Sequence, residues 1–152
     1  MIEFNNIEHG HAIARAIPRM YNPGVDPVIS NVSESGDLLG GVIYDGYTGP
    51  CIFIHQAGFD KHWMSRDMLW VAFDYPFNQI GCAKLCGTIP STNTELLDIN
   101  LRLGFYVEGS IKGAYPGGDM LILSMERDQC RWLKLKPRGL RSRVTSKGNN
   151  ER

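Results

Sequence analysis

The stretch that decides the fold class is CAKLCGTIPSTNTELLDINLRLGF, residues 82–105. Its first eight residues are mostly apolar and stop at Pro90, which predicts a strand. A capping box at Thr92–Glu95 then begins a helix whose leucine and isoleucine residues recur at helical spacing up to Gly104. A strand followed at once by an amphipathic helix is typical of α/β proteins.

A second strand and helix precede this stretch. Residues 51–58, CIFIHQAG, are rich in β-branched and aromatic side chains and predict a strand, whereas residues 59–64 are irregular and polar. Apolar residues then repeat every three or four positions across 65–81, so we expect a helix with Ser65 as its N-cap. Pro76 removes one backbone hydrogen bond and should bend or shorten this helix.

The flanking segments complete the pattern. Residues 6–20 predict an amphipathic first helix, which is followed by two strand patterns in residues 27–49. Residues 106–127 predict two strands around a Pro-Gly-Gly turn. We therefore predict an α/β fold with a mixed, mainly antiparallel sheet flanked by helices, in which a central strand–helix–strand crossover is right-handed.

The 152 residues predict one domain, because a chain of this length can bury a core without staples. Charge is uneven along the chain. Residues 134–152 hold seven basic residues and one acidic residue, against nine basic and 15 acidic residues in 1–133. We expect a domain at 1–133 and a disordered basic tail at 134–152, since the tail has few apolar residues. Such a tail could solubilise the protein or attract nucleic acid.

Neither a signal peptide nor a membrane-length apolar run is recognisable, so we expect a cytoplasmic protein that does not bind membranes. The four cysteines form no C-x-x-C pair, which favours reduced and mostly buried thiols. His9 and His11 form an H-x-H pair without further ligands nearby, so we predict no metal site.

The segment 93–105 resembles the end of the GNAT acetyltransferase domain, in which an asparagine precedes a helix that ends eleven residues later in Gly-Phe. Asn93 and Gly104 keep this spacing. The resemblance covers about residues 25–126 and is closest to the branch of ribosomal-protein N-terminal acetyltransferases and to small phage and prophage proteins. It implies acetyl-CoA as co-substrate, an amine acceptor on a protein or small molecule, and a dimer as a common assembly.

The resemblance also implies where the cofactor binds. Strand 51–58 would pair with the pantetheine arm and diverge from the strand that begins at 82, which opens a slot for the acceptor. The loop after it would hold the pyrophosphate at a helix N-terminus, although its sequence GFDKHWMSR lacks the glycines usual in the family. The candidate cofactor-binding residues are Gln56, Gly58, Lys61, Trp63, Ser65, Arg66 and Asn93. In the alternative interpretation Lys61 and Arg66 are solvated and Trp63 covers the core. Asn93 then only caps its helix.

Three residues are candidates for catalysis. His55 could relay a proton from the acceptor amine, because histidine exchanges protons near neutral pH. Glu108 is an acidic alternative, and it could instead recognise a basic acceptor or lie on the surface. Asn100 stands where many family members have a tyrosine that protonates the departing thiolate, and an amide can only hydrogen-bond the sulfur. Tyr75 or Tyr106 could supply that proton.

Three functions follow from these features. The first is an N-acetyltransferase. The second is a noncatalytic GNAT-fold binding or virion-associated module, which the atypical loop and the missing tyrosine favour. The third is a nucleic-acid-associated protein that acts through residues 134–152, and it is the least supported of the three because no aromatic residue is interleaved among the cations.

Overall fold

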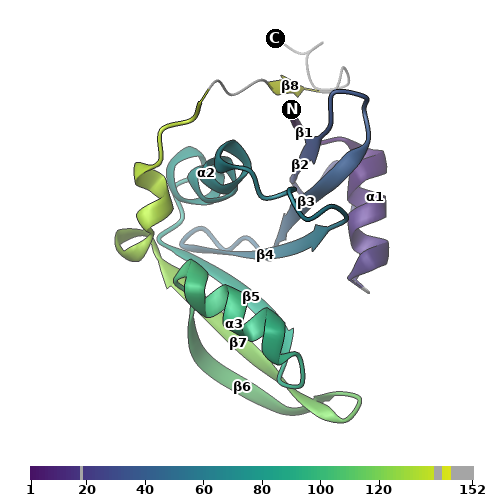
Figure 1. The fold of residues 1–152 in the computed structure, drawn as a ribbon. Helices are drawn as coiled ribbons and strands as arrows, with labels where there is room; N and C mark the ends of the chain where they lie inside the picture. The colour runs from purple at the N-terminus through teal and green to yellow at the C-terminus, as the bar shows by residue number, and fades with distance from the viewer. Residues whose placement is uncertain (18, 139–141, 145–152) are drawn as a thin grey trace.

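A computed structural model of the chain describes residues 1–17, 19–138 and 142–144, which form strands and helices around one sheet (Figure 1). The strands are β1 Ile2–Phe4, β2 Val28–Val32, β3 Leu38–Asp45, β4 Cys51–Gly58, β5 Lys84–Pro90, β6 Tyr106–Tyr115, β7 Gly118–Glu126 and β8 Ser142–Val144. The helices are α1 Ile7–Ala16, α2 Arg66–Asp74, α3 Thr94–Leu103 and three short segments, η1 Tyr75–Gln79, η2 Arg127–Gln129 and η3 Arg131–Lys134.

The eight strands of the described residues form one sheet in the order β6-β7-β5-β4-β3-β2-β1-β8. Neighbouring strands are antiparallel except β4 with β5 and β1 with β8. Helix α2 connects the parallel pair β4 and β5, so the predicted mixed sheet with a central crossover is confirmed. β1 and β8 were not predicted, because three residues are too few to show a strand period.

The helix boundaries follow from the capping residues. Ser65 is the N-cap of α2, as predicted, and its Oγ accepts a hydrogen bond from the Met68 backbone N–H at 3.2 Å. Pro76 ends the regular helix, and the chain continues as one π-helical segment, η1, in which the Ile80 N–H bonds the Tyr75 carbonyl. The N-cap of α3 is Asn93 rather than Thr92: the capping box was placed one residue early because both side chains can cap.

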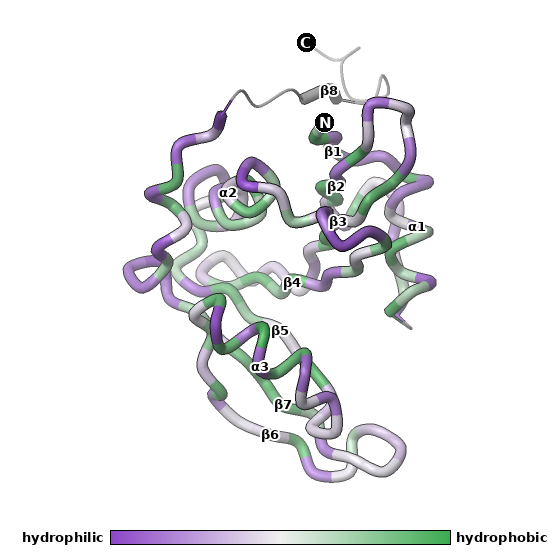
Figure 2. The backbone as a smooth tube through the Cα atoms, in the orientation of Figure 1, coloured by the Kyte–Doolittle hydropathy of each residue, from purple (hydrophilic) through white to green (hydrophobic). Residues whose placement is uncertain are grey.

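The helices cover the two faces of the sheet. Ile13 and Ala14 of α1 pack on Val28, Ile43 and Ala57, whereas α2 and α3 pack on the residues of the other face. Figure 2 shows hydrophobic residues along the central strands and hydrophilic residues on the peripheral loops and outer turns. The core is therefore split by the sheet, and its larger part lies between the sheet and the pair α2 and α3.

The C-terminal segment contacts α2 before it leaves the described part of the chain. Arg66 Nε donates to the Lys136 carbonyl at 2.8 Å, and the Arg138 backbone N–H donates to Asp67 Oδ1 at 2.8 Å. Residues 136 and 138 thus contact α2, and 142–144 pair with β1, while the expected boundary between a domain at 1–133 and a tail at 134–152 stays a prediction. The rest of the predicted tail, 139–141 and 145–152, lies outside the described residues, and so does Pro18. Among the described helices, none is long and apolar enough to span a bilayer.

Candidate functional site

The central strands β4 and β5 are paired only where they begin. Cys51–Phe53 pair with Lys84–Cys86, and the register goes no further. β4 continues to pair with β3 up to Gly58, and β5 continues to pair with β7 up to Pro90. From Ile54 and Gly87 onward the two strands therefore diverge, and each has an open edge with backbone donors and acceptors available to a ligand.

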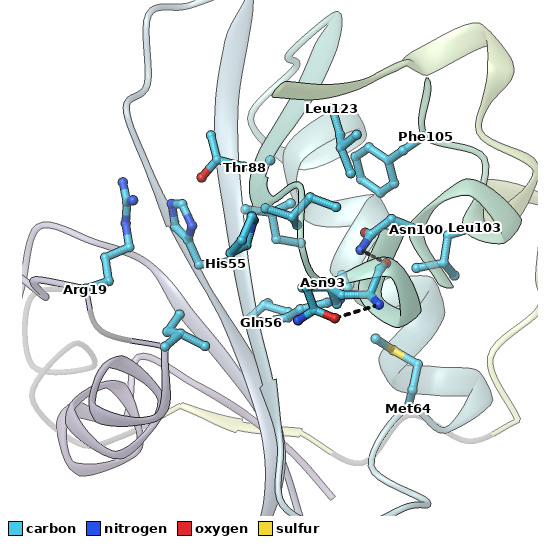
Figure 3. A pocket seen from close by; sticks show the side chains of 18 of the residues that line it. Arg19, His55, Gln56, Met64, Thr88, Asn93, Asn100, Leu103, Phe105 and Leu123 are labelled. Carbon is cyan, nitrogen blue, oxygen red and sulfur yellow. Dashed lines mark hydrogen bonds between the residues drawn. The ribbon is translucent and has the colours of Figure 1, made fainter. Parts of the chain in front are cut away.

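A cavity of about 310 Å³ occupies this divergence (Figure 3). Residues of β4, β5, α2 and α3 line it, and most of its wall is apolar. Figure 3 shows Arg19 and His55 on the side of the sheet that carries α1, whereas Asn93, Asn100 and Leu103 lie on the side of α3. The cavity thus passes between the strands, so two reactants could meet in it from opposite faces.

A second hollow of about 480 Å³ continues the cavity toward the loop before α2. The two share Gln56, Met64, Leu96 and Leu103. Lys61 is the cation of the second hollow and Asp60 its carboxylate. Together the two spaces form an elongated site of the size that small cofactors occupy.

The loop that borders the second hollow is anchored by Trp63. Its indole lies against the backbone of the paired glycines Gly40 and Gly58: a Cβ built on Gly58 would lie 2.2 Å from the Trp63 Nε1 atom. The Trp63 carbonyl accepts a hydrogen bond from Asn31 Nδ2 at 2.8 Å. Trp63 therefore covers part of the core and at the same time shapes the wall of the hollow.

His55 is held by a carboxylate that the sequence did not single out. His55 is 7% exposed, and its Nε2 lies 2.8 Å from Asp45 Oδ1. Arg19 Nε and Nη2 lie 2.8 and 2.6 Å from Asp45 Oδ2. Burial acts to raise the pKa of Asp45, but the hydrogen bonds from His55 and Arg19 outweigh it and hold the pKa below its ordinary value of 3.8.

Asp45 is therefore ionised at neutral pH and can only accept hydrogen bonds. Neutral His55 must then carry its proton on Nε2 and donate it to Asp45. This tautomer leaves the lone pair of Nδ1 available as a base. Asp45 thus orients the imidazole of His55, the residue predicted to act as the base.

On the opposite side, α3 presents two asparagines to the cavity. Asn93 Oδ1 accepts the Leu96 backbone N–H at 3.1 Å and so caps the helix. Asn100 is 8% exposed, and its Nδ2 donates to the Leu96 carbonyl at 2.8 Å. Both side chains line the cavity while they stabilise α3, so the cap role of Asn93 does not exclude contact with a cofactor.

Replacing Asn93 separates these two roles. We expect Asn93→Ala to lower the free energy of unfolding by about 1 kcal/mol, because a side-chain acceptor for the Leu96 N–H is lost. Asn93→Ser keeps an N-cap acceptor and should retain nearly full stability in urea unfolding. If Asn93 also holds the cofactor arm, the serine variant will bind acetyl-CoA more weakly despite its normal stability. Equal stability of the alanine and serine variants would contradict the cap role.

Three predicted site residues do not line either space. Ser65 is occupied as the cap of α2, and Arg66 donates to the Lys136 carbonyl. Glu108 lies on β6, where it accepts hydrogen bonds from Lys84 and Ser124. Those two bonds, that from Lys84 first, lower the pKa of Glu108. The predicted residues that line the cavity and hollow are His55, Gln56, Gly58, Lys61, Trp63, Asn93 and Asn100.

The structure adds residues that sequence reasoning missed. Arg19 and His55 both contact Asp45, and Tyr115 is among the residues that line the cavity. Tyr75 and Tyr106, the predicted proton donors, are not among the lining residues. His9 lies with its Nδ1 atom 2.7 Å from Ser30 Oγ, and His11 packs edge-on against Tyr21. Within the described residues no group of three or more histidine, cysteine or acidic side chains could hold a metal ion.

No family model and no curated protein sequence matches the chain. Solved structures do match. A mutant of the spermidine N-acetyltransferase SpeG from Vibrio cholerae is 14% identical with a TM-score of 0.61, over 85% of this chain and 79% of that one. An acetyltransferase of the GNAT family from Bacillus anthracis is 17% identical with a TM-score of 0.56, over 70% and 69%. The ribosomal-protein-S5-alanine acetyltransferase from Vibrio fischeri is 18% identical with a TM-score of 0.59, over 74% and 65%. These likenesses establish a shared fold.

Proposed function

We propose that this chain, which has the fold of the GNAT acetyltransferases, transfers an acetyl group from acetyl-CoA to a primary amine. The observation that carries the proposal is the divergence of β4 and β5 after three paired positions, with a cavity between their open edges. An acyl donor and an amine can reach each other through such an opening while the sheet holds both in place.

The α3 side suits the acetyl-CoA arm. Its walls are apolar, and the open edge of β4 from Ile54 to Gly58 offers backbone groups to the amides of pantetheine. The second hollow continues past Gln56 to Lys61, where the pyrophosphate would find a cation. We assign Gln56, Lys61 and Asn93 to cofactor binding, and Trp63 and Gly58 to shaping the hollow.

The α1 side suits the amine. In the proposed step the acceptor ammonium first loses a proton to His55 Nδ1, either directly or through water. The neutral amine nitrogen then attacks the thioester carbon, a C–N bond forms, and the C–S bond breaks. The nitrogen loses its second proton to solvent, and CoA leaves as a thiolate that takes up a proton, so the products are the neutral N-acetylated amine and CoA. Tyr115 is our candidate for the group that protonates the thiolate, because it lines the cavity and a phenol can donate a proton.

Isothermal titration with acetyl-CoA tests the first requirement of this function. We expect saturable binding at micromolar concentrations, with weaker binding of ADP, which lacks the arm. Lys61→Glu should weaken binding about tenfold or more, since it places a second carboxylate beside Asp60 in the hollow. Arg66→Glu is the matched control and should bind acetyl-CoA like the wild type, because Arg66 lines neither space.

The second candidate function is a noncatalytic module with the same fold. It predicts no binding of acetyl-CoA at millimolar concentration, or binding without transfer to any amine. An open cavity flanked by the oriented pair His55 and Asp45 favours the enzyme. Equal loss of binding in Lys61→Glu and Arg66→Glu would contradict the assignment of the hollow to the pyrophosphate.

A further inference from the structure

The charged groups at the cavity restrict the kind of amine that it can receive. Arg19 is the one permanently charged residue among the described residues that line it, and none of them is an aspartate or a glutamate. Asp45 is not among the lining residues, and its carboxylate already pairs with both Arg19 and His55. A polyamine in this space would therefore lie next to a guanidinium, and no lining carboxylate would be available to pair with its ammonium groups.

Arg19 retains donors for a ligand. Nε and Nη2 both donate to the same Asp45 oxygen, so one edge of the guanidinium is occupied. A guanidinium carries five N–H groups in a fork that matches a carboxylate, and those on the other edge are not used by any described residue. The Arg19 side chain is 38% exposed, so a ligand can reach it.

Arg19 and His55 lie on the same side of the sheet, at the same end of the cavity (Figure 3). Asp45 accepts hydrogen bonds from both and so fixes the guanidinium relative to the imidazole. If the amine of an acceptor lies at His55, a second functional group a few bonds from that amine lies close to Arg19. The pair thus has the geometry of a site for a bifunctional molecule.

We propose that the acceptor is a small amino acid, whose carboxylate binds Arg19 while its amine faces His55. This inference rests on the proposed acetyl transfer and narrows its acceptor to amines that carry a carboxylate. Arg19 is then a specificity-determining residue, because it binds a part of the acceptor that does not react.

The test compares the twenty standard amino acids with their carboxamides, in which the carboxylate is replaced by a neutral group of the same shape. For at least one amino acid we expect kcat/KM to exceed that of its amide about tenfold or more, mainly through KM. Spermidine and a short basic peptide should react more slowly still. Amides or spermidine that react as fast as the amino acids would overturn the proposal.

Substitutions of Arg19 test whether this residue causes the preference for amino acids over their amides. Arg19→Gln should raise KM for the amino acid to near that of its amide and leave the amide almost unchanged, whereas Arg19→Lys should keep part of the preference. Arg102→Gln is the control, because among the described residues the Arg102 side chain makes only an exposed i,i+4 ion pair with Asp98, while its carbonyl accepts a hydrogen bond from Arg131. A preference that survives intact in Arg19→Gln would contradict the assignment.

A binding experiment separates this inference from the proposed function. N-acetyl amino acids and N-acetyl amino acid amides are titrated into the protein saturated with CoA. The inference predicts that the carboxylates bind more tightly than the amides and that Arg19→Gln removes the difference, whether or not the protein turns over. No transfer to any amine would refute the enzyme, while equal binding of carboxylates and amides would refute the role of Arg19.

Discussion

His55→Ala is expected to lower kcat for acetyl transfer by about 10²- to 10⁴-fold while the dissociation constant for acetyl-CoA stays unchanged. His55 lines the cavity, and Asp45 holds its Nε2–H, so Nδ1 is the nitrogen that can accept the acceptor's proton. The histidine lies on the α1 side, away from the walls assigned to the cofactor arm (Figure 3). Its loss should therefore affect the chemical step rather than cofactor binding.

Steady-state rates and calorimetry with acetyl-CoA are measured on the same preparations. His11→Ala is the matched control, because His11 is exposed on α1 and contacts Tyr21. Asp45→Asn should also lower kcat, by a smaller factor, and shift the pH dependence of kcat, since an amide no longer selects the Nε2–H tautomer. An unchanged kcat in His55→Ala would remove the histidine from the mechanism, and weakened acetyl-CoA binding would mean that its role is structural.

The helices and the strands of the central sheet could be predicted from the sequence because their signals are local. Ser65 and Gly104 mark helix ends through their own chemistry: the serine accepts a hydrogen bond, and the glycine adopts a φ of 111° that other residues rarely reach. The order of strands and helices then restricts the topology to few choices. The same signals predicted His55 and Gln56 on the strand that borders the slot.

The constellation around His55 could not be predicted, because its members come from separate elements. Arg19 follows α1, and Asp45 ends β3, ten residues before His55. No sequence period relates the three, and only the pairing of β3 with β4 brings the carboxylate to the imidazole. Glu108 comes from the edge strand β6 and lies outside both spaces, where Lys84 and Ser124 donate hydrogen bonds to it.

Gly58→Ala is expected to destabilise the protein by about 1–3 kcal/mol and to weaken acetyl-CoA binding. The new Cβ would lie 2.2 Å from Nε1 and 2.4 Å from Cδ1 of Trp63, which is far inside van der Waals contact. The indole lies over both paired strands, since a Cβ built on Gly40 would also lie 2.6 Å from Cδ2 of Trp63. Trp63 must therefore swing outward and pull the loop with it, against the hydrogen bond that Asn31 donates to its carbonyl.

Gly109→Ala is the matched control for this substitution. Gly109 also lies in a strand and is not among the glycines with a positive φ, and a Cβ there would meet no described atom within 4 Å. Urea unfolding should place Gly109→Ala close to the wild type and Gly58→Ala clearly below it. Equal stability of the two variants would mean that the loop before α2 is not anchored by Trp63. Because the same loop forms the wall of the second hollow, a stable Gly58→Ala protein that binds acetyl-CoA normally would also argue against a pyrophosphate at Lys61.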